Sequence, residues 1–150
     1  MIRRLGVAIL IGVSVLLLLW YATLPNAETE RHQSTLEQEI KKIQLPSGGV
    51  VRSISLRHRA NHALVDEIVE GDFSYGDLRK HYDVVLASLG WRVRGEKTIR
   101  EWGSNNGGQV RWYCKGPYEA TLQYAGPSAN HDWNHSIALS WGIGRRCKMP

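Results

Sequence analysis

The chain lacks most of the short motifs that carry chemistry in small proteins. No Gly-x-Ser-x-Gly segment is present, which excludes the nucleophile turn of α/β-hydrolases. Its cysteines do not form a C-x-x-C pair, which excludes a thioredoxin-type redox site. No cysteine comes directly after the first apolar run, which excludes a lipid-modified N-terminus, and the chain has no internal repeat. We therefore expect a protein that is not an enzyme and has no cofactor.

An extreme charge of either sign is also missing. The chain has 19 Lys and Arg against 14 Asp and Glu, a net charge of +5, and two of those basic residues are Arg3 and Arg4. This mild excess argues against a nucleic-acid partner. It is compatible with a weak preference for anionic glycans or lipid headgroups.

What the chain does contain is an uncharged apolar run over residues 5–24, directly after Arg3 and Arg4. A helix of that length matches the hydrocarbon thickness of a bilayer, and the basic residues before it place the N-terminus on the cytoplasmic side. The run predicts a cytoplasmic stub at 1–4 and a transmembrane anchor at 5–24. The protein would then be single-pass in the inner (plasma) membrane, with a periplasmic or extracellular C-terminal domain. A cleaved signal peptide is the alternative.

Residues 27–45 predict a polar helix with a thin aliphatic stripe formed by Leu36, Ile40 and Ile43. The stripe is too short for a coiled coil, so we interpret the segment as a helical stalk. Homo-oligomer contact through the stripe is the sharper alternative. A Pro-Ser-Gly-Gly segment then marks the start of an extracytoplasmic domain at 49–150.

The clearest helix covers residues 75–89. Ser74 is a good N-cap with Asp77 three residues later, and Gly90 can adopt the left-handed conformation that ends a helix. The spacing of its apolar residues defines one face, formed by Leu78, Tyr82, Val85, Leu86 and Leu89.

Most of the remaining domain alternates apolar and polar residues, which predicts β-strands with one covered face. Two strands over 49–59 and 63–70 form a hairpin, and the chain is β-rich from residue 91 onward. The predicted fold class is α+β, an antiparallel sheet of about 5–6 strands covered on one face by one helix. The inward residues from 110 onward are predicted to be Val110, Trp112, Cys114, Tyr118, Ala120, Leu122, Tyr124, Ile137, Leu139 and Trp141.

Three segments, FSYGDLRKHYDVVLASLGW, WYCKGPYEATLQYAG and IALSWG, resemble small exported or membrane-anchored bacterial proteins that carry no assigned function. The resemblance covers about half of the chain. It implies an α+β domain outside the cytoplasm, and it brings no catalytic or binding residues with it.

The same alternation turns Arg111, Tyr113 and Lys115 outward. A cationic stripe with a central aromatic ring is a candidate binding surface. A solvated outer sheet face is the alternative. Further candidates for this surface are Arg92, Arg94 and Trp133.

The chain has an even number of cysteines, Cys114 and Cys147, in a small domain. Outside the cytoplasm this predicts a disulfide between them. Two unpaired thiols are the alternative.

The histidines suggest a metal site only weakly. Two pairs spaced four apart, His58 with His62 and His131 with His135, have the spacing of zinc ligands on a helix. Both pairs fall in predicted hairpin or loop segments, where that spacing defines no geometry. We therefore predict no metal site and interpret these histidines as surface polar residues.

Taken together, the sequence predicts a non-enzymatic, membrane-anchored interaction module outside the cytoplasm. Its expected partner is another protein of a cell-envelope assembly. The alternative is a binder of anionic glycan or lipid headgroups, and the third hypothesis is a metal-dependent hydrolase that uses the histidine pairs.

Overall fold

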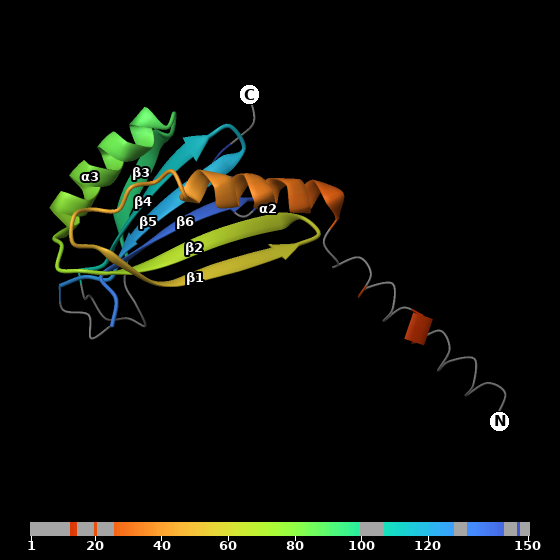
Figure 1. The fold of residues 1–150 in the computed structure, drawn as a ribbon, viewed down its shortest axis with the longest axis horizontal. Coiled ribbons are helices and arrows are strands. Elements are labelled where there is room, and N and C mark those ends of the chain that lie inside the picture. Colours follow the sequence, from red (N-terminus) through yellow and green to blue (C-terminus); the bar gives the residue numbers. More distant parts are fainter. Residues whose placement is uncertain are drawn as a thin grey trace.

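In the part of the chain that the structure describes, six antiparallel strands form one sheet, and two helices lie on one of its faces (Figure 1). The computed structural model describes residues 13–14, 20, 26–99, 107–127, 132–142 and 147. The elements in that part of the chain are α2 (Ala27–Ile40), β1 (Val50–Arg59), β2 (His62–Glu70), α3 (Tyr75–Ser88), β3 (Arg92–Thr98), β4 (Gln109–Lys115), β5 (Tyr118–Tyr124) and β6 (His135–Trp141). The predicted α+β class and the predicted hairpin of β1 and β2 are confirmed.

The strand order is β1-β2-β6-β5-β4-β3, so β6 returns to pair with β2 and joins the two halves of the sheet. Paired residues face the same side of a sheet, so the register defines rows that cross all six strands. On the helix side of the sheet, the row at mid-sheet is Leu56, Val65, Leu139, Ala120, Tyr113 and Val93. Its four middle residues are fully buried, which places the core between the helices and the central strands.

Helix α3 begins and ends where the sequence predicts. The Ser74 side chain accepts a hydrogen bond from the Asp77 amide at 3.2 Å. At the other end Gly90 has a φ of +85°, and the Trp91 amide donates to the Leu86 carbonyl at 2.9 Å. This closing turn buries Trp91, so the local helix signals also determine where the next strand starts.

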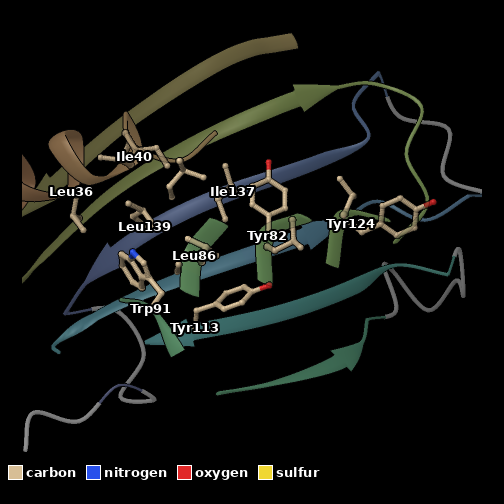
Figure 2. Packing of buried hydrophobic residues seen from close by; sticks show 14 of the residues in the cluster. Leu36, Ile40, Tyr82, Leu86, Trp91, Tyr113, Tyr124, Ile137 and Leu139 are labelled. Carbon is tan, nitrogen blue, oxygen red and sulfur yellow. The ribbon is translucent and has the colours of Figure 1, made fainter. Parts of the chain in front are cut away.

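The prediction of a single covering helix and a stalk at 27–45 is wrong. Helix α2 packs across β2 and β6, and its stripe residues Leu36 and Ile40 join the same core cluster as Leu139 (Figure 2). Its first turn is also attached to the sheet, because Thr29 Oγ1 donates to the Ala60 carbonyl at 3.0 Å. The predicted stripe for homo-oligomer contact is therefore buried inside one chain.

The predicted membrane anchor also needs correction. In the part of the chain that the structure describes, no helix is long and apolar enough to cross a bilayer. The run at 5–24 lies outside the described residues, apart from Val13, Ser14 and Trp20, and so does the stub at 1–4. Within the described residues, this finding contradicts the predicted transmembrane helix with its stalk, and with it the single-pass inner-membrane location.

Candidate functional site

The stripe predicted to face solvent lies on the helix-covered face instead. Tyr113 is fully buried, and Arg111 and Lys115 share its side of β4. The prediction for β4 is wrong by one residue, so Val110, Trp112 and Cys114 take the face without helices. The predicted faces of β5 and β6 are confirmed, since Ala120, Leu122, Ile137 and Leu139 are buried under the helices.

The β4–β5 turn explains this shift. Gly116 and Pro117 form a two-residue loop, which pairs Lys115 directly with Tyr118. Because paired residues share a face, an inward Tyr118 also turns Lys115, Tyr113 and Arg111 inward. Because these side chains are polar, the sequence predicts them outward, although the length of the turn already specifies the opposite face.

Arg111 and Tyr113 serve as the attachment of helix α3 to the sheet. Arg111 Nε donates to Asp83 Oδ1 at 2.9 Å and Nη2 donates to Oδ2 at 3.0 Å, a bidentate pair. The Tyr113 hydroxyl donates to Asp83 at 2.9 Å, and Arg111 also contacts Glu96. Burial alone would lower the pKa of Arg111, but its bonds to Asp83 raise it, so the guanidinium stays charged.

Lys115 attaches helix α2 to the sheet in the same way. Its Nζ donates to Glu39 Oε2 at 2.5 Å, and Lys42 donates to the other oxygen of that carboxylate at 2.6 Å. Burial acts to raise the pKa of Glu39, but the two lysines outweigh it and the pKa is lowered. The two charged side chains of the predicted stripe therefore form ion pairs that hold the helices on the sheet.

The other predicted surface residues are not brought together. Arg92 and Arg94 are exposed on the edge strand β3. Arg92 pairs with Cys114 at the end of the sheet opposite to Trp133, which precedes β6. Trp133 lines two hollows at that far end, which neither of the two arginines lines.

The histidine pairs do not form metal sites in the described part of the chain, where no group of three candidate ligands occurs. His58 pairs with Ala63 and His62 with Arg59, so the register places these two histidines on opposite faces of the hairpin. His131 lies outside the described residues. Its predicted companion His135 is fully buried in the core.

His135 forms a buried polar pair with helix α3. The Tyr82 hydroxyl lies 2.9 Å from His135 Nε2, and Nδ1 lies 3.1 Å from the Asn134 side-chain oxygen. Burial, aided by the charge of His81, lowers the pKa of His135 to about 4. Burial also raises the pKa of nearby Glu67 and, with the charge of Glu67, that of Tyr82. This arrangement suits a neutral imidazole.

His135 therefore makes folding sensitive to acid. Its pKa falls from 6.5 in the unfolded chain to about 4 in the folded one, so its contribution is complete above pH 6.5 and is lost as pH falls toward 4. The full loss amounts to about 3 kcal/mol. Asp66 and Glu67, whose pKa values are raised by burial, act with the opposite sign and offset part of it.

We expect His135→Gln to remove this sensitivity. We measure the free energy of unfolding in urea at pH 7 and at pH 4.5. Its decrease between these two pH values should be about 2–3 kcal/mol smaller in the variant than in the parent. His62→Gln, at a half-exposed position, is the matched control and should keep the parent's acid loss. An equal acid loss in His135→Gln would show that another group titrates.

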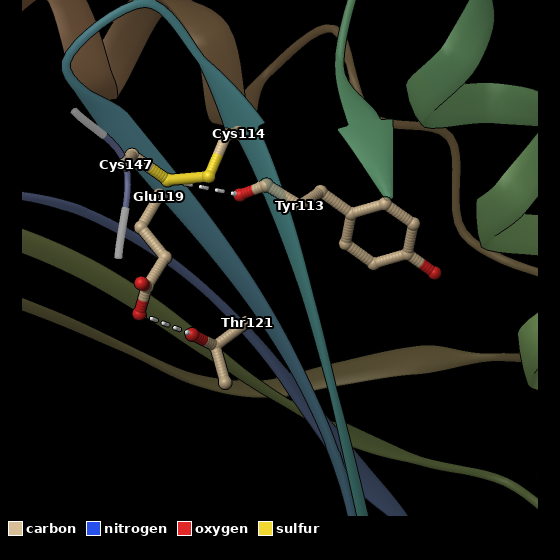
Figure 3. Close-up of a disulfide and its surroundings, with 5 residues drawn as sticks. All are labelled: Tyr113, Cys114, Glu119, Thr121 and Cys147. Atoms are coloured by element: carbon tan, nitrogen blue, oxygen red, sulfur yellow. Dashed lines mark hydrogen bonds between the residues drawn. A yellow bond between two sulfur atoms is a disulfide. The ribbon is translucent and has the colours of Figure 1, made fainter. Parts of the chain in front are cut away.

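Cys114 and Cys147 form a disulfide, with 5.5 Å between their Cα atoms (Figure 3). The bond lies on the face without helices and attaches Cys147 to β4. It closes a loop across 33 positions, which stabilises the fold by about 3–4 kcal/mol in the chain-entropy account. Its role is structural.

On the sheet, the exposed large apolar residues lie on its two edge strands, and Val84 of helix α3 is exposed as well. On β1, Val50 is 62% exposed, Ile54 57% and Leu56 53%. On β3, Val93 is 49% exposed. Among the described strands β1 pairs with β2 alone, so its other edge is open for hydrogen bonding. This edge is the candidate site.

Comparison of the chain with models of known families, with curated proteins and with solved structures gives no match. A function for this chain therefore has to follow from its own geometry.

The sequence contains a signal for the β1 edge that the alternation of apolar and polar residues does not reveal. From Val50 to His62 the chain contains three arginines and two histidines and no acidic residue. The neighbouring strand β2 carries Asp66, Glu67 and Glu70, which balance part of this charge from one side. Positive charge along an edge strand favours an acidic segment as the neighbour on its open side.

Proposed function

We propose that this chain is a non-enzymatic interaction module that binds an extended, acidic segment of a partner protein along the open edge of β1. The observation that carries the proposal is a ten-residue edge strand on which exposed Ile54 and Leu56 lie on one face, and two arginines lie on the other. Strand addition of this kind uses main-chain hydrogen bonds for affinity and side chains for specificity.

The two faces of β1 define the pattern of the partner segment. Ile54 and Leu56 lie on the helix side, because they pair with Glu67 and Val65. Arg57 and Arg59 pair with Leu64 and His62 on the opposite side. A segment that alternates apolar and acidic residues would pack on the first pair and neutralise the second.

A second copy of the chain is a poorer occupant. Two β1 strands side by side would bring three arginines from each copy, Arg52, Arg57 and Arg59, to the same ladder. Like charges on adjacent strands are destabilising, and charged edges with bulges are a common protection against self-association. The register shift between Val51 and Ser53 is such an irregularity.

The test uses a short labelled peptide that alternates valine and glutamate, with a valine and lysine peptide as its counterpart. We expect the acidic peptide alone to bind, with NMR shift changes on the amides of β1. Arg57→Glu combined with Arg59→Glu should weaken binding by about tenfold or more.

Val93→Ser is the matched control, because Val93 is an exposed apolar residue on the opposite edge strand. It should bind the acidic peptide like the parent, whereas Ile54→Ser should bind it more weakly. Equal binding of both peptides, or shift changes on β3 in place of β1, would refute the proposal.

A second candidate function has one observation in its favour. The hairpin of β1 and β2 has a hollow of about 600 Å³ lined by Leu56, Arg57, His58, Arg59 and His62. Such a basic hollow suits an anionic glycan or headgroup more than a peptide strand. A sulfated oligosaccharide that displaces the acidic peptide in a salt-sensitive way would favour this function.

A further inference from the structure

The face of the sheet without helices carries a second hollow, separate from the β1 edge. It measures about 210 Å³ and is lined by Asp66, Ile68, Gln123, Trp133 and Ser136. The register explains the space: Ser136 lies between Ile68 and Gln123 in one cross-strand row, and Ala138 lies beside Asp66 in the next. Small side chains on β6 leave room between larger ones on β2 and β5.

Asp66 is the unusual residue in this hollow. Its Oδ1 is buried and has no hydrogen-bond partner in the described part of the protein. Ser136 donates a hydrogen bond to the carboxylate, but burial still raises the pKa of Asp66. The charge of Arg57 also acts on this carboxylate. Even so, a desolvated carboxylate oxygen without a hydrogen-bond donor costs free energy. Such an atom points to a ligand that brings a donor.

The other lining groups narrow the class of ligand. Gln123 has an amide that donates and accepts, Ser136 has a hydroxyl, and Ile68 and the Trp133 indole supply apolar surface. An anion would be repelled by Asp66. A metal ion would find too few ligands, since no group of three is present among the described residues. A ring that carries several hydroxyls and an apolar face satisfies the carboxylate, the amide and the indole together.

We propose that this hollow binds one neutral saccharide unit, whose hydroxyl groups hydrogen bond to Asp66 and Gln123 while its ring lies against the Trp133 indole. Trp133 also lines a larger hollow of about 760 Å³ with Arg52, Glu70 and Tyr124. A second sugar unit can therefore extend past the indole. The acidic segment proposed for β1 needs neither Gln123 nor Trp133, so these two residues distinguish the site from the β1 edge.

The test titrates the full chain with cellobiose and with N,N′-diacetylchitobiose, and follows the Trp133 indole signal by NMR. We expect at least one of these neutral disaccharides to shift that signal with millimolar affinity. Asp66→Asn should weaken binding by about tenfold or more, and Gln123→Ala should weaken it as well. Glu28→Gln, on helix α2, is the matched control and should bind like the parent.

Asp66→Asn has a second readout that separates loss of binding from loss of fold. Because it removes a desolvated charge, its melting temperature should equal or exceed that of the parent. No shift with either disaccharide, or unchanged binding in Asp66→Asn, would refute the saccharide site. A shift with tetramethylammonium or calcium alone would show a cation site and refute it too. None of these outcomes depends on the peptide test at β1.

Discussion

Tyr113→Ala is expected to lower the free energy of unfolding by about 3–5 kcal/mol, the range for loss of a large aromatic side chain from a core. Tyr113 is fully buried among the residues that join α3 to the sheet. Its removal leaves a cavity and takes a donor from Asp83. Urea unfolding, with the disulfide intact, measures the change.

Two further variants separate the contributions. Tyr113→Phe keeps the ring and removes only the bond to Asp83, so it should cost about 1–2 kcal/mol. Adding Arg111→Glu to Tyr113→Ala places a carboxylate beside Asp83 and Glu96, and we expect this double variant not to fold. A double variant with a melting temperature close to the parent's would mean that Tyr113 faces solvent after all.

Leu36→Ala is expected to lower the free energy of unfolding by about 2–5 kcal/mol, because the Leu36 side chain is fully buried in the core. A stalk outside the domain would show almost no effect at this position. The measurement therefore tests whether α2 belongs to the folded unit. Chemical unfolding followed by far-UV and near-UV circular dichroism suffices, since one cooperative transition is expected.

Ser34→Ala, on the exposed side of α2, is the control for helix propensity and should change stability by less than about 0.5 kcal/mol. A loss at Leu36 no larger than this would contradict the packing of α2 on β2 and β6. A separate early transition in Leu36→Ala would show that α2 detaches while the sheet stays folded.

Local signals predicted the elements whose boundaries depend on neighbouring residues. The Ser74 cap, the Gly90 turn and the apolar spacing between them specify α3 without help from distant parts of the chain. The faces of β5 and β6 follow from alternation, because their buried positions are apolar. The pairing of the two cysteines followed from their number.

The candidate site was not predicted, for a physical reason that recurs in this fold. Sequence patterns treat a polar residue as exposed, yet several inward positions here are polar and have distant partners. Lys115 meets Glu39 across 76 positions, and Arg111 meets Asp83 across 28. Conversely, Ile54 and Leu56 look like core residues and are exposed, because the helices leave these two side chains uncovered.

The sequence by itself determined the α+β class, the helix at α3, the β1–β2 hairpin and the faces of the last two strands. Only the tertiary structure decided that α2 packs on the sheet and that Tyr113 points inward. Both depend on ion pairs and hydrogen bonds between segments far apart in the chain, and such partners meet only once the sheet has formed. The open edge of β1 and the unpaired oxygen of Asp66 are likewise features of the assembled sheet, because exposure and desolvation depend on what the rest of the chain covers.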